Sequence, residues 1–320
     1  MTAFDISTAP PVVLIMGPTG AGKTDLVLRL AEDWPIDIIS VDSAMVYRDM
    51  NIGTGKPPPE VLARHPHRLV DILDPSQAYS AGQFVRDATA AIEEAHRGGR
   101  LPVLVGGTML YFRALRRGLA ALPSADPAVR AQIDREAAEK GWPALHRELA
   151  QIDPQAAARI RPNDAQRIQR ALEVFRLTGK SLSELHVTAH SPRPKLRFLA
   201  YAWVPGERAR LYEAIEARFH RMMKDGFLEE VRALYARGDL HAELPSIRSV
   251  GYRQLWEHLQ GKETLESAAQ RAIVATRHLA RRQLIWLRSE SEVSWVDALE
   301  SRADAHIVRV IDSVLNERRT

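Results

Sequence analysis

Cysteine is absent from the 320-residue sequence. This absence excludes disulfides, thiolate zinc sites, iron–sulfur clusters and cysteine nucleophiles, and nothing points to an oxidising compartment. Long hydrophobic runs are missing as well. The apolar run at residues 12–16 is too short for the core of a signal peptide or for a membrane span, and no longer run follows it. We therefore expect a cytoplasmic protein with no membrane contact.

Charge of one sign is only slightly in excess, with 44 Lys and Arg against 40 Asp and Glu. A hydrophobic content of 45% with 26% charged residues excludes a disordered chain. The excess is uneven: residues 1–112 hold 9 basic and 13 acidic side chains, residues 113–195 hold 15 and 9, and residues 196–320 hold 20 and 18. The basic middle favours a polyanionic partner, and a solvated charged face is the alternative.

Strand and helix signals alternate in the first part of the sequence. Buried strands are predicted at residues 12–16, 36–40, 68–72 and 102–107. A helix with Phe84, Ala88 and Ile92 on one face is predicted to end at Gly98-Gly99. This alternation is typical of an α/β fold with a parallel sheet covered by helices on both faces.

The pattern of residues 116–194 is helical, with no strand signal. Helices are predicted to begin at Asp126-Pro127 and Asn163-Asp164 and to end at Gly141 and Gly179, with Ser191–Pro194 as a linker. Further on, strands are predicted at residues 196–204 and 293–296, and helices at residues 207–223, 226–236 and 264–287. We therefore predict an α/β core from residues 1–115 and 195–320, the second part mostly helical, interrupted by an all-helical insertion over residues 116–194.

A phosphate-binding loop is the strongest motif. The pattern G-x-x-x-x-G-K-[ST] is matched by Gly17, Pro18, Thr19, Gly20, Ala21, Gly22, Lys23 and Thr24. An apolar strand precedes the loop and a helix follows it, so backbone N–H groups and the helix N-terminus can converge on phosphate oxygens. Lys23 supplies a cation and Thr24 a hydroxyl suited to Mg²⁺. This context predicts a P-loop NTPase-like sheet, and a plain glycine turn is the alternative.

Two further strand ends carry candidate chemistry. Ligands of open α/β sheets lie beyond the carboxyl ends of strands, which places Asp42 near the phosphate loop. Its carboxylate can hold Mg²⁺ through water or accept a proton, and a helix N-cap is an equal alternative. The strand that ends at Gly106-Gly107 is followed by Thr108 and no acid, unlike the strand of an ATPase. Thr108 and the adjacent amides could donate to phosphate, or the glycines could simply form a tight turn.

Six segments together resemble the bacterial tRNA dimethylallyltransferase family, also called tRNA isopentenyltransferase. They occur in order over most of the chain, at residues 17–24, 42–57, 105–111, 163–173, 247–254 and 276–283. Three departures from the family pattern are visible. Gly20-Ala21 replaces Ala-Ser in the loop, and Gly55 replaces Ala, with little expected effect. Met45 replaces Gln, and a thioether is only a weak hydrogen-bond acceptor for RNA.

The resemblance implies transfer of a dimethylallyl group from dimethylallyl diphosphate to N6 of adenosine 37, in tRNAs that read codons beginning with U. The loop then holds the diphosphate, with Mg²⁺ as cofactor and Thr24 as its ligand, and a monomer is expected. The amino group must lose a proton as it attacks carbon, and Asp42 matches the family's base. Lys23, Thr108 and Arg218 would stabilise the leaving diphosphate, with Arg221 as the alternative to Arg218.

The expected partner is the tRNA anticodon stem-loop, whose target base must be extruded before it can react. Gln166, Arg167 and Arg170 share a helical face, and residues 271–288 hold five Arg and no acid. For both stretches a solvated amphipathic face is the alternative. The residues expected to contact tRNA are Asp42, Ser43, Ala44, Met45, Thr108, Arg130, Gln166, Arg167, Ile168, Gln169, Arg170, Ser246, Ile247, Arg248, Ser249, Val250, Gly251, Thr276, Arg277, Arg281, Arg282 and Gln283.

Two other functions fit parts of the pattern. A small-molecule or nucleotide kinase would also use the phosphate loop, but it would bind ATP and would not need the late arginines. A non-catalytic RNA-binding ATP switch would need a strand that ends in Asp to hold Mg²⁺, which the sequence does not offer. Titration with dimethylallyl diphosphate against ATP separates these possibilities.

Overall fold

The computed structural model describes residues 9–120, 122–188 and 195–317. The chain forms two compact units. The core unit comprises Met1–Arg116 and Pro194–Thr320, and the helical unit comprises Arg117–Arg193. This division falls within one residue of the insertion boundaries that the sequence suggested. The predicted linker Ser191–Pro194 lies outside the described residues.

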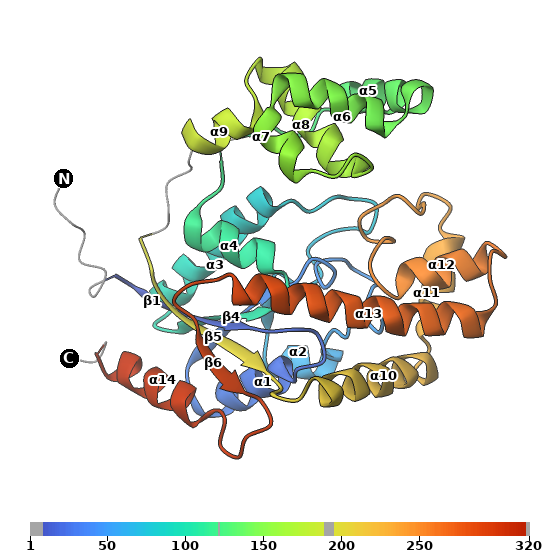
Figure 1. Ribbon diagram of the computed structural model, residues 1–320. Coiled ribbons are helices and arrows are strands. Elements are labelled where there is room, and N and C mark those ends of the chain that lie inside the picture. Colours follow the sequence, from blue (N-terminus) through green and yellow to red (C-terminus); the bar gives the residue numbers. More distant parts are fainter. Residues whose placement is uncertain (1–8, 121, 189–194, 318–320) are drawn as a thin grey trace. The chain divides into compact units, whose positions relative to one another are not determined.

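A single parallel sheet runs through the described part of the core unit (Figure 1). Its strand order is β3-β2-β4-β1-β5-β6. The strands are β1 (Pro11–Met16), β2 (Ile36–Val41), β3 (His67–Arg68), β4 (Leu101–Gly106), β5 (Arg197–Val204) and β6 (Ser294–Asp297). Every residue of β1, β2 and β4 is buried, which explains their continuous apolar sequences. The predicted α/β fold with a parallel sheet is confirmed.

The strand register brings three chain segments to one edge of the sheet. Met16 at the end of β1 and Val41 at the end of β2 both lie opposite Gly106 at the end of β4. Gly17, Asp42 and Gly107 therefore begin their loops side by side, at the edge where ligands of such sheets bind.

Helices cover both faces of this sheet. Those of the core unit are α1 (Lys23–Asp33), α2 (Pro59–Arg64), α3 (Ala81–Arg97), α4 (Met109–Arg117), α10 (Arg208–Lys224), α11 (Phe227–Ala236), α12 (Tyr252–Leu259), α13 (Leu265–Arg288) and α14 (Ala305–Glu317). Apolar residues of α3 and α4 pack on one face, and those of α1 and α14 on the other. A separate cluster joins α10 to α13 with the loop after β2. Among the described residues, no helix has the length and apolar character to span a membrane.

The helical unit has helix ends where the sequence placed them. Its helices are α5 (Pro127–Lys140), α6 (Trp142–Ile152), α7 (Pro154–Arg159), α8 (Ala165–Thr178) and α9 (Leu182–Thr188). The Asp126 carboxylate accepts hydrogen bonds from two N–H groups of the first turn of α5, and Asp164 does the same for one N–H of α8. Gly141 and Gly179 end α5 and α8 with φ of 79° and 69°. These local predictions are confirmed.

The strand predicted at residues 68–72 is wrong beyond Arg68. Leu69 and Asp71 have φ of 64° and 56°, left-handed values at which a strand cannot continue. The segment pairs instead with the loop after β2, because Leu73 N–H donates to Val46 O and Arg48 N–H donates to Leu73 O. An apolar pattern carries no sign of such backbone angles, so the sequence could not reveal this turn.

Candidate active site

The phosphate loop connects β1 to α1 and is shaped by its glycines. Gly20 and Gly22 have φ of 82° and 76°, which favour glycine, and Gly22 is the N-cap of α1. Gly17 packs so closely against Trp203 O that a Cβ would overlap it. Lys23 opens α1, and its Nζ donates to Pro18 O at 2.7 Å. The helix N-terminus and this lysine together form an anion site.

The cations of the phosphate cavity are half-buried or exposed side chains that line the same cavity. Burial, followed by the nearby Arg218, lowers the pKa of Lys23 to about 8, against the opposing effect of Asp42. Burial also lowers the pKa of Arg218, with Asp42 opposing the shift and Arg221 adding to it. Positive charges that are partly desolvated and close together attract an anionic ligand, because the ligand relieves both the desolvation cost and the repulsion.

Two cavities meet at this edge of the sheet. The phosphate cavity, of about 500 Å³, is lined by Thr19–Thr24, Met45, Lys56 and Arg221 among others. The adjoining cavity, of about 520 Å³, is lined by Ser43, Ala44, Thr108 and the apolar side chains of Met109, Leu110 and Trp286 among others. The two cavities share the residues Thr19, Asp42, Thr54, Gly107, Arg218 and Gln283. Asp42 and Arg218 therefore stand where a ligand in one cavity meets a ligand in the other.

Asp42 stabilises a turn and not a helix N-terminus, because the residues that follow it form turns. Its Oδ1 accepts hydrogen bonds from Ala44 N–H at 2.8 Å and Met45 N–H at 3.2 Å, which fixes the turn after β2. Within the described residues its Oδ2 has no hydrogen-bond partner. One carboxylate oxygen thus caps the turn, and the other is available to accept a proton at the junction of the cavities.

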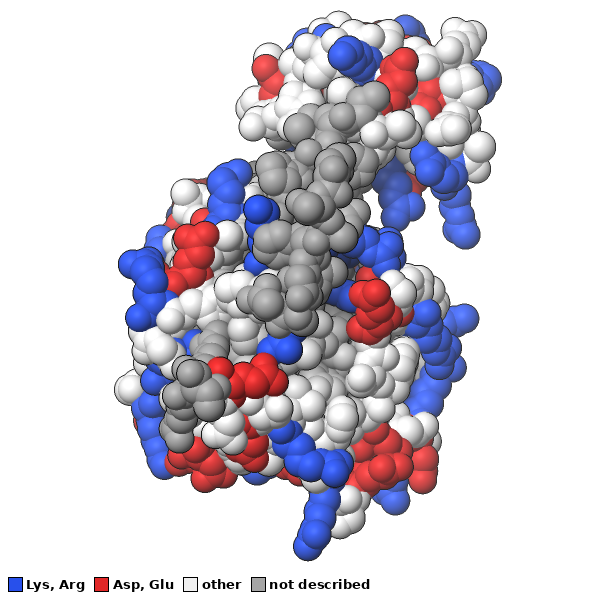
Figure 2. All heavy atoms as spheres, turned by 90° about the vertical axis from the view of Figure 1, so that its left-hand side faces the viewer, with Lys and Arg blue, Asp and Glu red and all other residues white. Residues whose placement is uncertain are grey.

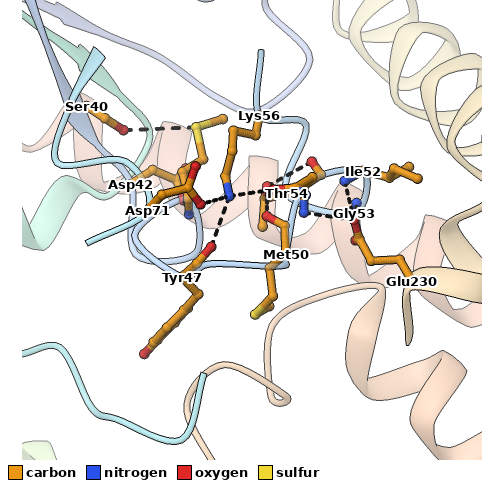
Figure 3. A network of polar contacts seen from close by, with 12 residues as sticks. Ser40, Asp42, Tyr47, Met50, Ile52, Gly53, Thr54, Lys56, Asp71 and Glu230 are labelled. Atoms are coloured by element: carbon orange, nitrogen blue, oxygen red, sulfur yellow. Dashed lines mark hydrogen bonds and ion pairs between the residues drawn. The ribbon is translucent and has the colours of Figure 1, made fainter. Parts of the chain in front are cut away.

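The loop that follows Asp42 is held from within by Lys56 (Figure 3). The Lys56 side chain is 2% exposed. Its Nζ donates to Tyr47 O at 2.9 Å and to Asn51 Oδ1 at 2.7 Å, and it forms an ion pair with Asp71. This single ammonium group uses its donors to close the loop, which explains why a charged side chain is buried here.

Glu230 on α11 holds the same loop from outside (Figure 3). Its carboxylate accepts hydrogen bonds from the consecutive N–H groups of Asn51, Ile52 and Gly53 at 2.7 to 3.1 Å. It also accepts one from the Tyr252 hydroxyl at 2.5 Å. No sequence signal indicates this role, because the pattern around Glu230 is that of an ordinary surface residue of a helix.

The loop delivers Thr54 and Gly55 to Arg218, whose Nη2 donates to Thr54 O at 3.3 Å. Gly55 has a φ of 65°, and a Cβ at this position would overlap the Arg218 guanidinium. Here the glycine makes room for the arginine, and the expectation that glycine in place of alanine has little effect stays a prediction. Met45, the other departure in this loop, has its sulfur 4.0 Å from the Ser40 hydroxyl.

The last two motif segments, at residues 247–254 and 276–283, lie partly in the adjoining cavity and partly in the interior. Arg248, Ser249, Val250, Gly251, Thr276, Arg282 and Gln283 line the adjoining cavity. Ser246 and Ile247 are fully buried, so their side chains have no surface for the expected RNA contact. The Ser246 hydroxyl instead donates to Pro75 O at 2.6 Å.

The arginine run of α13 is partly neutralised by acids of other elements. Arg271 pairs with Glu257 and Glu263. Arg277 pairs with Glu216 of α10 at 2.5 Å. Among the described residues, no ion pair engages Arg281, Arg282 or Arg288, all of which are exposed. Fewer arginines of α13 are thus available to an anionic partner than the sequence suggested.

A buried carboxylate organises the basic residues of the helical unit. Glu173 is fully buried and accepts hydrogen bonds from Arg130 at 2.8 Å and from Arg170 at 2.6 Å. Burial alone would raise the pKa of Glu173, but these bonds and the Asp126 N–H hold it below its usual range. Arg170 also donates to Pro123 O at 2.7 Å. Both arginines are therefore anchored within the unit.

The remaining predicted residues of α8 differ in accessibility. Ile168 lies in the apolar core of the helical unit, so its side chain cannot make the expected RNA contact. Gln169 donates to Asp134 at 2.6 Å. Gln166 is exposed, and the Arg167 side chain is 67% exposed with a loose ion pair to Asp164. Arg167 is thus the most available cation of the predicted face.

Basic and acidic side chains are interspersed on the face of the core unit that Figure 2 shows. Where this face shows described residues, their basic side chains form no continuous field of the kind that binds a polyanion.

A parallel sheet with a phosphate loop after β1, a carboxylate after β2 and half-buried cations is the arrangement of a phosphate-loop α/β enzyme. The model of the family described as IPP transferase matches residues 45–290, and that described as Isopentenyl transferase matches residues 10–70. The chain belongs to the IPP transferase family and is a prenyl-transferring enzyme.

Solved structures agree with this assignment. The chain is 36% identical to the tRNA isopentenylpyrophosphate transferase of Bacillus halodurans, over 97% of this chain and 98% of the other, with a TM-score of 0.69. It is 29% identical to the corresponding enzyme of Staphylococcus epidermidis, with coverages of 97% and 99% and a TM-score of 0.67. A eukaryotic dimethylallyltransferase acting on tRNA is 27% identical, with coverages of 97% and 79% and a TM-score of 0.78. The family resemblance of the sequence is confirmed, and neither a kinase nor an ATP switch is among these relatives.

Proposed function

We propose that the chain acts as a cytoplasmic monomer that transfers a dimethylallyl group from dimethylallyl diphosphate to N6 of adenosine 37, in tRNAs that read codons beginning with U. The observation that carries the proposal is the position of Asp42 and Arg218 in the lining of both cavities. One cavity offers a phosphate loop and the other offers apolar and basic side chains. The relatives described as tRNA isopentenylpyrophosphate transferase and as dimethylallyltransferase acting on tRNA support the two substrates.

The reaction follows from this arrangement. The diphosphate would occupy the phosphate cavity against the loop amides, Lys23 and Arg218, and the extruded adenine would occupy the adjoining cavity. The N6 lone pair attacks the first carbon of the dimethylallyl group. The electrons of the carbon–oxygen bond leave with the diphosphate, and the N6 proton passes to Asp42 Oδ2. Lys23 and Arg218 stabilise the charge that develops on the leaving group.

The residues present fit Mg²⁺. The Thr24 hydroxyl and the Asp42 carboxylate line the same cavity and are hard oxygen donors. Among the described residues, no group of three acidic or histidine side chains could form an all-protein metal cage. This suits an ion that keeps several waters and binds substrate phosphates. When bound, Mg²⁺ would add positive charge beside the diphosphate.

A transfer assay with an anticodon stem-loop tests the proposal. Purified protein, Mg²⁺ and dimethylallyl diphosphate should add one dimethylallyl group to a stem-loop with adenosine at position 37, as measured by mass spectrometry. A matched stem-loop with inosine at position 37 lacks the amino group and should stay unmodified. ATP in place of dimethylallyl diphosphate should give no modified RNA, and ATP hydrolysis without transfer would contradict the proposal in favour of an ATPase.

A further inference from the structure

The side-chain amide of Gln283 forms hydrogen bonds to two glycine-containing turns, one that follows β1 and one that follows β4. Its Oε1 accepts a hydrogen bond from Thr19 N–H of the phosphate loop, and its Nε2 donates to Gly107 O, each at 2.9 Å. These partners lie 264 and 176 residues away along the chain. A Cβ at Gly107 would overlap the Gln283 Nε2, so this glycine is needed for the amide to approach.

The bridge lies at the boundary between the two cavities, because Thr19, Gly107 and Gln283 line both. The Thr19 N–H is occupied by Gln283 and is therefore not available to a phosphate. On the other side, Gly107 precedes Thr108, whose own N–H donates to Val41 O at 3.2 Å. The amide thus sets the spacing between the loop that would hold the diphosphate and the turn that carries Thr108.

We propose that Gln283 is a positioning residue of the transfer reaction, which holds the phosphate loop and the Gly107–Thr108 turn in a fixed relation, and that it is not an RNA contact. The inference rests on the proposed function, which supplies the two substrates, dimethylallyl diphosphate and the tRNA stem-loop. One N–H and one oxygen lone pair of the Gln283 amide already bind the protein backbone, which fixes the orientation of the amide and makes it part of the protein framework. A small misplacement of groups that hold a leaving group slows transfer strongly, since the bound geometry must match the reacting one.

The test compares Gln283→Met with Gln270→Met, which changes an exposed glutamine of the same helix. Methionine has a similar length and helix propensity to glutamine, so the first variant removes the two hydrogen bonds with little effect on α13. Three quantities are measured: the Kd for dimethylallyl diphosphate without RNA, the Kd for the stem-loop, and the single-turnover transfer rate.

For Gln283→Met we expect a loss of roughly tenfold in the product of diphosphate affinity and transfer rate. Its stem-loop Kd should be unchanged, and Gln270→Met should match the wild type in all three quantities. Weaker stem-loop binding with normal diphosphate binding would make Gln283 an RNA contact and overturn the proposal. Wild-type values for all three quantities would overturn it too. A wild-type protein that binds no dimethylallyl diphosphate would instead refute the proposed function.

A second variant covers the case in which Gln283→Met does not fold. Gln283→Glu keeps an acceptor for Thr19 N–H, loses the donor to Gly107 O and adds a negative charge, whose effect on diphosphate binding is removed by working at saturating diphosphate. A slower single-turnover rate at saturating diphosphate, with a normal stem-loop Kd, supports the positioning role. A normal rate in this variant contradicts it.

Discussion

In the proposed reaction, Asp42 is the residue that takes the proton. Its Oδ1 is engaged by two backbone amides, so replacement by alanine would also release the turn after β2. An asparagine at this position would keep an oxygen acceptor for these amides and could not take a proton, which makes Asp42→Asn the cleaner test of the base.

We expect Asp42→Asn to slow transfer by about 10²–10⁴-fold, the usual cost of losing a general base, while diphosphate and stem-loop affinities stay near wild type. Single-turnover rates on preformed complexes measure this. Asp49→Asn is the matched control, since Asp49 is an exposed residue of the same loop. Near-normal transfer by Asp42→Asn would eliminate Asp42 as the base.

Lys23 should make diphosphate binding depend on pH. Burial and Arg218 lower its pKa to about 8, below the value of 10.5 in the unfolded chain. Lys23 is charged below this pKa and attracts the anion, and it loses that charge as the pH rises through about 8. Affinity for dimethylallyl diphosphate should therefore fall over this range.

The measurement is the Kd for dimethylallyl diphosphate across a pH series, for wild type and for Lys23→Arg. Arginine stays charged throughout, and the titration of the ligand is the same for both proteins. The difference between the two profiles therefore isolates Lys23. Parallel profiles through pH 8 would mean that Lys23 keeps its proton or does not face the ligand.

Local sequence determines some structural elements more completely than others. The helix ends at Asp126, Gly141, Asp164 and Gly179 are set by capping side chains and left-handed glycines within a few residues. The loop after β2 has no such local determinant. It is held by Glu230, which lies on α11 and reaches it only because the two segments pack together.

Glu230→Gln should loosen this loop. The amide that replaces the carboxylate has one acceptor oxygen for three backbone N–H groups, and each lost bond to a charged group costs about 1.5–3 kcal/mol. We expect lower stability in urea unfolding and faster hydrogen exchange at the amides of Asn51, Ile52 and Gly53. Transfer should slow as well, since Arg218 depends on Thr54. Glu229→Gln, at an exposed neighbour, should change none of these; unaltered exchange in Glu230→Gln would contradict the role.

At the scale of the whole molecule, the chain separates phosphate binding from the unit that carries the basic excess. The phosphate cavity is lined by residues of the core unit alone. In the helical unit the Arg167 side chain is exposed to solvent, whereas Arg170 is hydrogen-bonded to the buried Glu173. Neutralising Arg167 and Arg170 together would therefore mix a loss of surface charge with a loss of folding stability.

Arg167→Gln alone should weaken tRNA binding and reduce the slope of log Kd against log salt by roughly 0.7–0.9 for one lost phosphate contact. The Kd for dimethylallyl diphosphate should not change. Arg170→Gln serves as the contrast: it leaves the buried Glu173 short of a partner, so it should lower the stability of the helical unit. An unchanged salt slope in Arg167→Gln would make this residue a solvated surface side chain.

Local sequence determined the parallel sheet, the phosphate loop, the edge at which Asp42 and Thr108 lie, and most helix ends. Each of these depends on neighbours along the chain: apolar runs, glycine angles, capping groups and the rule that ligands bind beyond strand ends. The ordered motifs also determined the family. The turn at Leu69 and Asp71 could not be predicted, because an apolar pattern does not indicate left-handed backbone angles.

Only the tertiary structure decided which polar groups are available. It showed that Gln283 bridges Thr19 and Gly107, that Gly55 makes room for Arg218, and that Glu173 occupies Arg130 and Arg170. Most of these partners lie dozens to hundreds of residues apart, and a side chain carries the same local signal whether its partner is the protein or a substrate. Packing settles that choice, because a buried polar group must find its partner in whatever the fold brings beside it.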